Sequence, residues 1–144
     1  MSETNNKKEK VVFVNGIFDI LHPGHIQLFK FAKSLGDKLI VGINSDRVTK
    51  ILKGEERPIN DQESRKLMLE SLGIMDEVVI FDDVRIGNIV RQLKPDILVQ
   101  GGEHKVEQIR QIDNLPPEVE IQLFPMVGNF STTNVIKKIR GEKL

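Results

Sequence analysis

Residues 11–25 read VVFVNGIFDILHPGH, and this stretch decides the predicted fold. It opens with a run of β-branched and aromatic residues, which is typical of a strand buried on both faces of a parallel sheet. Asn15 and Gly16 end the run. Pro23 suits the first turn of a helix, and the residues after it have apolar side chains at helical spacing. The stretch therefore predicts a strand, a glycine-containing turn and a helix start.

The same alternation continues along the chain. Four further apolar runs predict strands, at Leu39–Ile43, Val78–Phe81, Ile97–Val99 and Ile121–Phe124. Segments with helical spacing lie between them, and one follows a candidate capping residue at Asn60 or Asp61. Alternating strands and helices indicate βαβ units. We therefore predict an α/β fold with a single Rossmann-like, doubly wound parallel sheet in residues 11–144, behind a disordered polar tail at residues 1–10.

The composition excludes several classes of protein. The chain of 144 residues has 21 Lys and Arg, 21 Asp and Glu, and no cysteine. Zero net charge argues against nucleic-acid binding, which draws on clustered basic residues, and the lack of cysteine excludes disulfides and thiolate chemistry. No stretch approaches the ~20 apolar residues of a membrane span. We expect a cytoplasmic protein that binds neither nucleic acid nor membranes.

Polar residues gather after four of the predicted strands, where open α/β sheets bind their ligands. They are Asn15, Gly16, Asp19, His22 and His25 after the first strand; Asn44, Ser45 and Asp46 after the second; Gly101, Gly102, His104 and Lys105 after the fourth; and Gly128, Asn129, Ser131, Thr132 and Thr133 after the fifth. We expect these four loops to converge on one site. The polar loop at residues 53–60 is either a lid over that site or an ordinary connection.

The predicted phosphoryl chemistry depends on two histidines. His22 and His25 are three residues apart at a predicted helix start, so both rings can face the same side and donate to phosphoryl oxygens. The N–H groups and dipole of a helix start also favour a phosphate. Such a pair can stabilise the charge of a pentacoordinate phosphorus transition state. The alternatives are a structural pair and a zinc site, for which His104 is the only further histidine.

The stretch from Gly16 to His25 resembles the nucleotide-binding signature of the cytidylyltransferase-like nucleotidyltransferases, whose hallmark is His-x-Gly-His. Further matches resemble one branch, the bacterial D-glycero-beta-D-manno-heptose 1-phosphate adenylyltransferases. They lie at residues 52–54, 57–60, 63–67, 94–96, 101–102 and 131–139, so that the resemblance covers nearly the whole chain from Val11 to Ile139. It implies transfer of a nucleotidyl group from a nucleoside triphosphate to a phosphorylated sugar, with release of pyrophosphate.

The resemblance also implies roles for individual residues. Catalysis falls to His22, His25 and Lys53. The nucleotide would be bound by Asn15, Gly16, Ile17, Phe18, Gly24, Gly101, Ser131, Thr132 and Thr133, and the candidates for binding the acceptor are Asp19, Arg57, Arg65, Glu103, His104 and Lys105. Mg²⁺ would bridge the phosphates of ATP or CTP without a direct protein ligand. The alternatives are a capping role for Asp19, and a subunit contact or a surface salt bridge for Arg65.

Some residues depart from the family pattern. Ile17 replaces a small or hydroxyl-bearing residue, and Glu103-His104 replace the Asp-Tyr that is more common in the heptose branch. Residues 127–130 lack the arginine of glycerol-3-phosphate cytidylyltransferases, which counts against that alternative. A non-catalytic nucleotide-binding module is the alternative of another class. The expected partners are a nucleoside triphosphate, a sugar phosphate, a second copy in a homodimer, and a separate sugar kinase upstream.

Overall fold

Five parallel strands form the centre of the computed structural model, which describes residues 8–102, 104–125 and 131–143. Their order in the sheet is β3-β2-β1-β4-β5, and every neighbouring pair is parallel. The strands are β1 (Val11–Gly16), β2 (Lys38–Asn44), β3 (Glu77–Phe81), β4 (Ile97–Gly101) and β5 (Glu120–Phe124). Each contains one of the apolar runs, so the predicted doubly wound sheet is confirmed.

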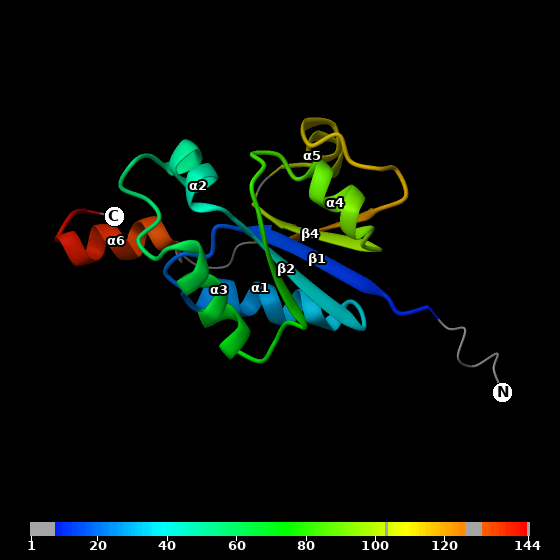
Figure 1. Ribbon diagram of the computed structural model, residues 1–144, viewed down its shortest axis with the longest axis horizontal. Helices are drawn as coiled ribbons and strands as arrows, with labels where there is room; N and C mark the ends of the chain where they lie inside the picture. Colours follow the sequence, from blue (N-terminus) through cyan, green and yellow to red (C-terminus); the bar gives the residue numbers. More distant parts are fainter. Residues whose placement is uncertain (1–7, 103, 126–130, 144) are drawn as a thin grey trace.

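Helices cover both faces of this sheet (Figure 1). One face packs against α1 (Pro23–Ser34) and α3 (Gln62–Ser71), and the other against α4 (Gly87–Leu93) and α5 (Val106–Ile112). Successive side chains of a strand point to opposite faces. Val12 accordingly joins the cluster that contains Phe29 of α1, whereas Phe13 joins the cluster that contains Val90 of α4. Burial on both faces is why the strands are continuously apolar rather than alternating.

Two helices and part of the tail differ from the sequence prediction. The sequence analysis assigns no helix to the segments that form α2 (Asp46–Lys53) and α5. Both helices are short, and few of their residues are buried. Residues 1–7 of the expected tail lie outside the described residues, but Lys10 exchanges hydrogen bonds with Asp37, at 2.8 Å in each direction. The ordered fold therefore includes Lys10.

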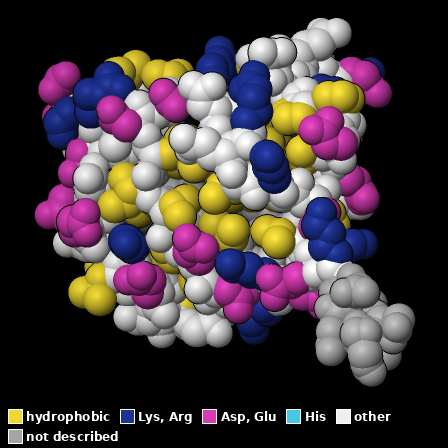
Figure 2. Space-filling view, turned by 45° about the vertical axis from the view of Figure 1, so that its right-hand side comes forward, with side chains coloured by type: hydrophobic (Ala, Val, Ile, Leu, Met, Phe, Trp, Pro, Cys, Tyr) yellow, Lys and Arg dark blue, Asp and Glu magenta, His cyan; other side chains and the backbone are white. Residues whose placement is uncertain are grey.

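The surface mixes charges of both signs. Figure 2 shows Lys and Arg side chains interspersed with Asp and Glu over one face of the molecule. This matches the equal numbers of basic and acidic residues in the sequence. Among the described residues, no helix is both long and apolar enough to span a membrane.

The sheet places its ligand-binding edge between two strands. β1 and β4 are neighbours, and the helices that follow them, α1 and α5, lie on opposite faces. A crevice opens at such a topological switch point, outside the carboxyl ends of the strands. In Figure 1, β1 runs from the N-terminal side of the molecule toward this edge, where α6 (Thr132–Arg140) also lies. The topology thus points to the end of β1 as the functional site.

Candidate active site

A cleft of about 450 Å³ lies at the carboxyl ends of β1 and β4. It brings together predicted residues from four segments of the chain: the β1–α1 turn with the start of α1, the end of α2 with the loop after it, the end of β4, and the start of α6. The lining residues are Gly16, Ile17, Phe18, Asp19, His22, Gly24, His25, Leu28, Lys53, Arg57, Gly101, Ser131, Thr132 and Thr133.

Sequence reasoning missed Leu28. The signal was present, because Leu28 follows His25 by three residues and therefore shares its helix face.

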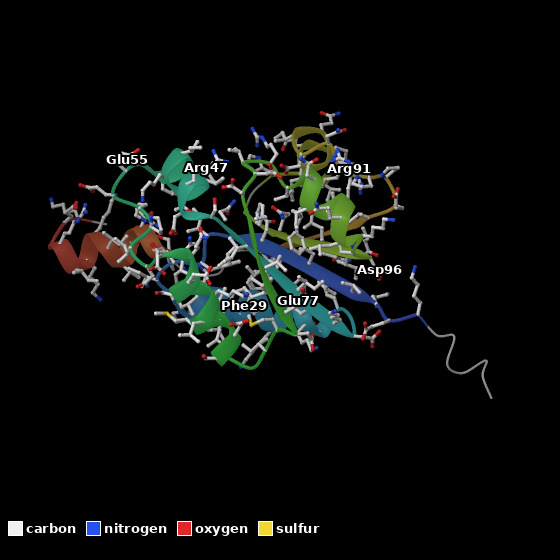
Figure 3. All side chains as sticks on the ribbon, viewed as in Figure 1. Phe29, Arg47, Glu55, Glu77, Arg91 and Asp96 are labelled. Atoms are coloured by element: carbon white, nitrogen blue, oxygen red, sulfur yellow. The ribbon has the colours of Figure 1, made fainter. Side chains whose placement is uncertain are left out.

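A larger hollow of about 780 Å³ lies at the other end of the sheet, next to Pro95, Asp96 and Pro116. Figure 3 shows Asp96 and Arg91 well away from Glu55, which is in the connection between α2 and α3. The larger hollow is lined by no imidazole or hydroxyl side chain among the described residues. We therefore assign the active site to the smaller cleft, which has both and lies at the switch point.

The two imidazoles form the cap of α1. Nδ1 of His22 accepts a hydrogen bond from the backbone N–H of Gly24 at 3.1 Å, and Nδ1 of His25 accepts one from the backbone N–H of His22 at 3.2 Å. These reciprocal bonds are a capping box built from histidines rather than from the usual Ser and Glu. The rings stack with their centroids 3.7 Å apart. The same two hydrogen bonds thus cap the helix and orient the rings.

This arrangement sets the protonation state of both rings. A neutral imidazole whose Nδ1 accepts a hydrogen bond carries its proton on Nε2. Burial lowers the pKa of His25 to about 4, with a smaller contribution from the nearby His22, and burial also lowers the pKa of His22. At neutral pH the cleft of the unliganded protein therefore contains two neutral rings, each with an Nε2–H donor.

The turn before α1 is strained and tightly packed. Phe18 has a φ of 49°, a left-handed conformation that is uncommon for a bulky residue. Its buried ring contacts the rings of His25 and Phe29 edge-on, with centroid distances of 5.3 and 4.9 Å. A Cβ atom added to Gly16 would lie 2.7 Å from the Phe18 ring, so glycine is required there for this packing. The imidazole of His25 is thereby also held by the Phe18 ring.

The start of α6 closes another wall of the cleft. The hydroxyl of Ser131 accepts a hydrogen bond from the backbone N–H of Asn134 at 2.9 Å and caps the helix. The hydroxyl of Thr132 donates to the carbonyl of Ile20 at 3.0 Å, which ties α6 to the β1–α1 turn across 112 residues of sequence. Two helix starts, those of α1 and α6, therefore border one cleft, and both favour anions.

Arg65 is buried, so the alternative of a surface salt bridge is wrong, and the residue does not line the cleft. The residue is 1% exposed, and its guanidinium donates to three groups of the protein. These are the carbonyl of Ile17 at 2.7 Å, the carbonyl of Asn60 at 3.0 Å and a carboxylate oxygen of Asp46 at 2.9 Å. Arg65 thus joins the β1–α1 turn, the start of α2 and the loop before α3 from inside the protein.

Asp19 also connects the β1–α1 turn with the loop at residues 53–60. Its buried carboxylate accepts hydrogen bonds from the backbone N–H groups of Ile59 at 2.6 Å and Asn60 at 2.9 Å. The carboxylate therefore fixes the loop at residues 53–60. Asp19 and Arg65 are together called the buried brace below.

Several predicted site residues do not line the cleft. Asn15 accepts a hydrogen bond from Gln100 at 2.5 Å within the sheet, while His104 and Lys105 lie exposed after β4. The expected loop after β2 is also absent from the lining, because Ser45 caps α2 and Asp46 pairs with Arg65. The loop at residues 53–60 takes its place by contributing Lys53 and Arg57. Glu103, Gly128 and Asn129 lie outside the described residues.

The comparisons with known proteins agree with this geometry. Residues 13–138 match the family model described as cytidylyltransferase-like. The chain belongs to the cytidylyltransferase-like family. It is 46% identical over 136 residues to the "Bifunctional protein HldE" of Campylobacter concisus, and 47% identical over 131 residues to that of Marinomonas. These matches cover 94% and 90% of the chain but 28% of each relative.

Solved structures share the fold of this nucleotidyltransferase. The lipopolysaccharide core biosynthesis protein from Thermoplasma volcanium is 27% identical, with a TM-score of 0.66 over 85% of this chain and 100% of that one. Pantothenate synthetase from Thermus thermophilus is 18% identical, with a TM-score of 0.63 over 88% of this chain and 61% of that one, which shows the fold alone. The predicted resemblance to the cytidylyltransferase-like family is confirmed.

The buried brace makes a prediction about stability. Replacement of Arg65 by Gln removes the bonds to two carbonyls and leaves Asp46 without its partner, so the free energy of unfolding should fall by roughly 2–4 kcal/mol. Urea denaturation measures this change. Glu70→Gln, exposed on the same helix, is the control and should change the value by less than about 0.5 kcal/mol. Equal effects of the two substitutions would show that Arg65 does not join the loops.

The depressed pKa values predict how stability depends on pH. Because the pKa of His25 is about 4 in the folded chain against 6.5 ordinarily, the unfolded chain binds more protons between these values. The stability that depends on a neutral His25 ring is therefore fully present above pH 6.5 and is lost as the pH falls toward 4. Acidification from pH 7 to 5 should cost the wild type roughly 1–2 kcal/mol more than His25→Asn.

Urea midpoints of both proteins at the two pH values measure this difference. The exposed His104 offers a matched control, since His104→Asn should lose as much stability on acidification as the wild type. The same acid loss in His25→Asn as in the wild type would contradict the assignment of a buried, neutral His25.

Proposed function

We propose that this nucleotidyltransferase transfers the adenylyl group of ATP to a heptose 1-phosphate or a similar sugar 1-phosphate. The stacked His22 and His25 pair, opposite the start of α6 in one cleft, carries the proposal. The motif resemblance to heptose 1-phosphate adenylyltransferases and the identity to the HldE proteins support this acceptor. The similarity to a protein described as a lipopolysaccharide core biosynthesis protein supports a role in carbohydrate synthesis.

The proposed reaction is a single displacement at the α-phosphorus. A phosphate oxygen of the sugar phosphate forms the new bond to this phosphorus, the bond to the bridging oxygen breaks, and pyrophosphate leaves with the electron pair. The acceptor is already an anion at neutral pH, so the chain does not need to remove a proton from it. The Nε2–H groups of His22 and His25 would donate to oxygens of the triphosphate as charge builds up there. Ser131, Thr132 and the α6 start would bind the β- and γ-phosphates.

Nucleotidyltransferases typically use a divalent metal, and Mg²⁺ is proposed here. Mg²⁺ is usually held through substrate phosphates and water with only one or two carboxylates. The carboxylate of Asp19 is the only one among the described lining residues, and it already accepts two backbone hydrogen bonds. The residues therefore fit an ion held mainly by the phosphates. When bound, it would neutralise phosphate charge, while the chain's own groups position the triphosphate.

Two other functions are alternatives to this proposal. A glycerol-3-phosphate or other polyol-phosphate cytidylyltransferase would use the same cleft with CTP, and the family match includes that chemistry by name. A non-catalytic nucleotide-binding module would keep the fold without turnover. The capping histidines favour an active enzyme, because a structural cap needs only the ordinary Ser, Thr, Asp or Asn. A cytoplasmic location, a homodimer and a separate upstream sugar kinase also remain proposals.

A pyrophosphate-release screen tests the function directly. ATP and CTP are each combined with a panel of sugar 1-phosphates and polyol phosphates in the presence of Mg²⁺. ATP with a heptose 1-phosphate or a close analogue should release pyrophosphate fastest. Turnover with CTP only would sink the adenylyl proposal, and no release from any pair would favour the binding module.

The imidazole of His25 should stabilise the transition state of the proposed reaction. His25→Ala is expected to lower kcat by roughly 10²- to 10³-fold, by analogy with the loss of one transition-state donor. Gln111→Ala, which removes an exposed side chain of α5 outside the cleft, should retain wild-type turnover. Initial rates of pyrophosphate release, with melting curves to confirm folding, provide the measurement. Near-normal turnover of His25→Ala would remove His25 from this role.

A further inference from the structure

Arg57 lies at the boundary of two hollows. It lines the active-site cleft and also an adjoining hollow of about 250 Å³ between the 53–60 loop and α6. Lys53 and Thr133 line both hollows as well. The cleft therefore continues past these residues into a second space under α6, which we call the α6 hollow.

The guanidinium of Arg57 is buried but incompletely satisfied. Its side chain is 13% exposed, and its Nε is a buried donor without a hydrogen-bond partner among the described residues. The carboxylate oxygen Oδ2 of Asp19 is 3.6 Å from this Nε, which is too far for a hydrogen bond. Both oxygens of that carboxylate instead accept backbone N–H groups of the same loop. A buried unpaired donor is costly, and such groups call for an explanation.

The charges around the cleft favour an anion at this guanidinium. Lys53 and Arg57 are the two permanent cations among the described lining residues. His22 and His25 cannot supply a full charge at neutral pH in the unliganded protein, because burial lowers the pKa of each ring. A triphosphate and a sugar phosphate repel each other when they share a site, so a fixed cation is needed where they meet. The planar fork of arginine suits the phosphate dianion.

The positions of the other anion-binding groups separate the two phosphates. His22 and His25 at the α1 start, and Ser131 and Thr132 at the α6 start, line the cleft but not the α6 hollow, and the triphosphate is proposed to bind beside them. Arg57 instead faces the junction with the α6 hollow, whose lining includes the charged side chains of Lys137 and Glu142. Charged groups of both signs can bind sugar hydroxyls.

We propose that Arg57 binds the phosphate of the acceptor at this junction, with the sugar in the α6 hollow. This inference rests on the proposed function and names the residue that brings the nucleophile to the nucleotide. Asp19 is then a positioning residue, because it fixes the loop that carries Arg57 and lies beside its guanidinium.

Steady-state kinetics test the assignment. Arg57→Gln should raise KM for the sugar phosphate by about 10- to 100-fold, as expected for losing a charged hydrogen-bond pair, and should leave KM for ATP within about twofold. Arg57→Lys should lie between, because it keeps the charge but loses the fork. Arg85→Gln removes an exposed arginine that lines neither hollow and should change neither KM. A rise in KM for ATP alone, or no change in either KM, would overturn the proposal.

A binding measurement separates this inference from the proposed function. The ¹⁵N–¹H signal of the Arg57 Nε–H, assigned by its loss in Arg57→Gln, is followed in the wild-type protein with a non-hydrolysable ATP analogue bound. Addition of inorganic phosphate should then shift this signal. If no acceptor is adenylylated but the signal shifts, the proposed function fails and the anion site stands. A signal that moves with the ATP analogue and not with phosphate would place Arg57 on the nucleotide and overturn the inference.

Discussion

The start of α1 depends on hydrogen bonds that two imidazoles accept through their Nδ1 atoms. Most helices are capped by a small polar side chain that has no other task. Here the capping bonds of His22 and His25 also fix the tautomer of each ring and stack the two rings face to face. The helix cannot be capped in this way without the proton being placed on Nε2. The same hydrogen bonds therefore cap the helix and fix the protonation of the two rings.

The buried brace extends this order to the rest of the cleft. Arg65 and Asp19 connect the turn that carries Phe18 with the loop that carries Arg57, although these segments are about 40 residues apart in sequence. The groups that favour anions are therefore gathered at one cleft. The chain has equal numbers of acidic and basic residues, yet two helix starts, two N–H donors and two cations face one cleft. A protein of zero net charge can in this way bind a highly charged nucleotide.

The sequence predicts the sheet well because its strands are buried on both faces and so remain apolar throughout. It also predicts the His22 and His25 pair, since proline, glycine and the spacing of three define a helix start. It does not predict α2 and α5, which are short and bury few residues. The role of Arg65 was also missed, because its three acceptors, Ile17, Asp46 and Asn60, come from separate segments that only the tertiary fold brings together. Long-range pairing of this kind leaves no local pattern.

Two neutral imidazoles, protonated on Nε2, are preorganised at the start of α1. ¹⁵N NMR of histidine side chains in the wild-type protein at pH 7 measures this most directly, because the two ring nitrogens of a neutral imidazole have different chemical shifts according to which carries the proton. We expect Nε2–H tautomers for His22 and His25, with a further shift of these Nε2–H signals when ATP is added. Nδ1–H tautomers, or fully charged rings in the unliganded protein, would contradict it.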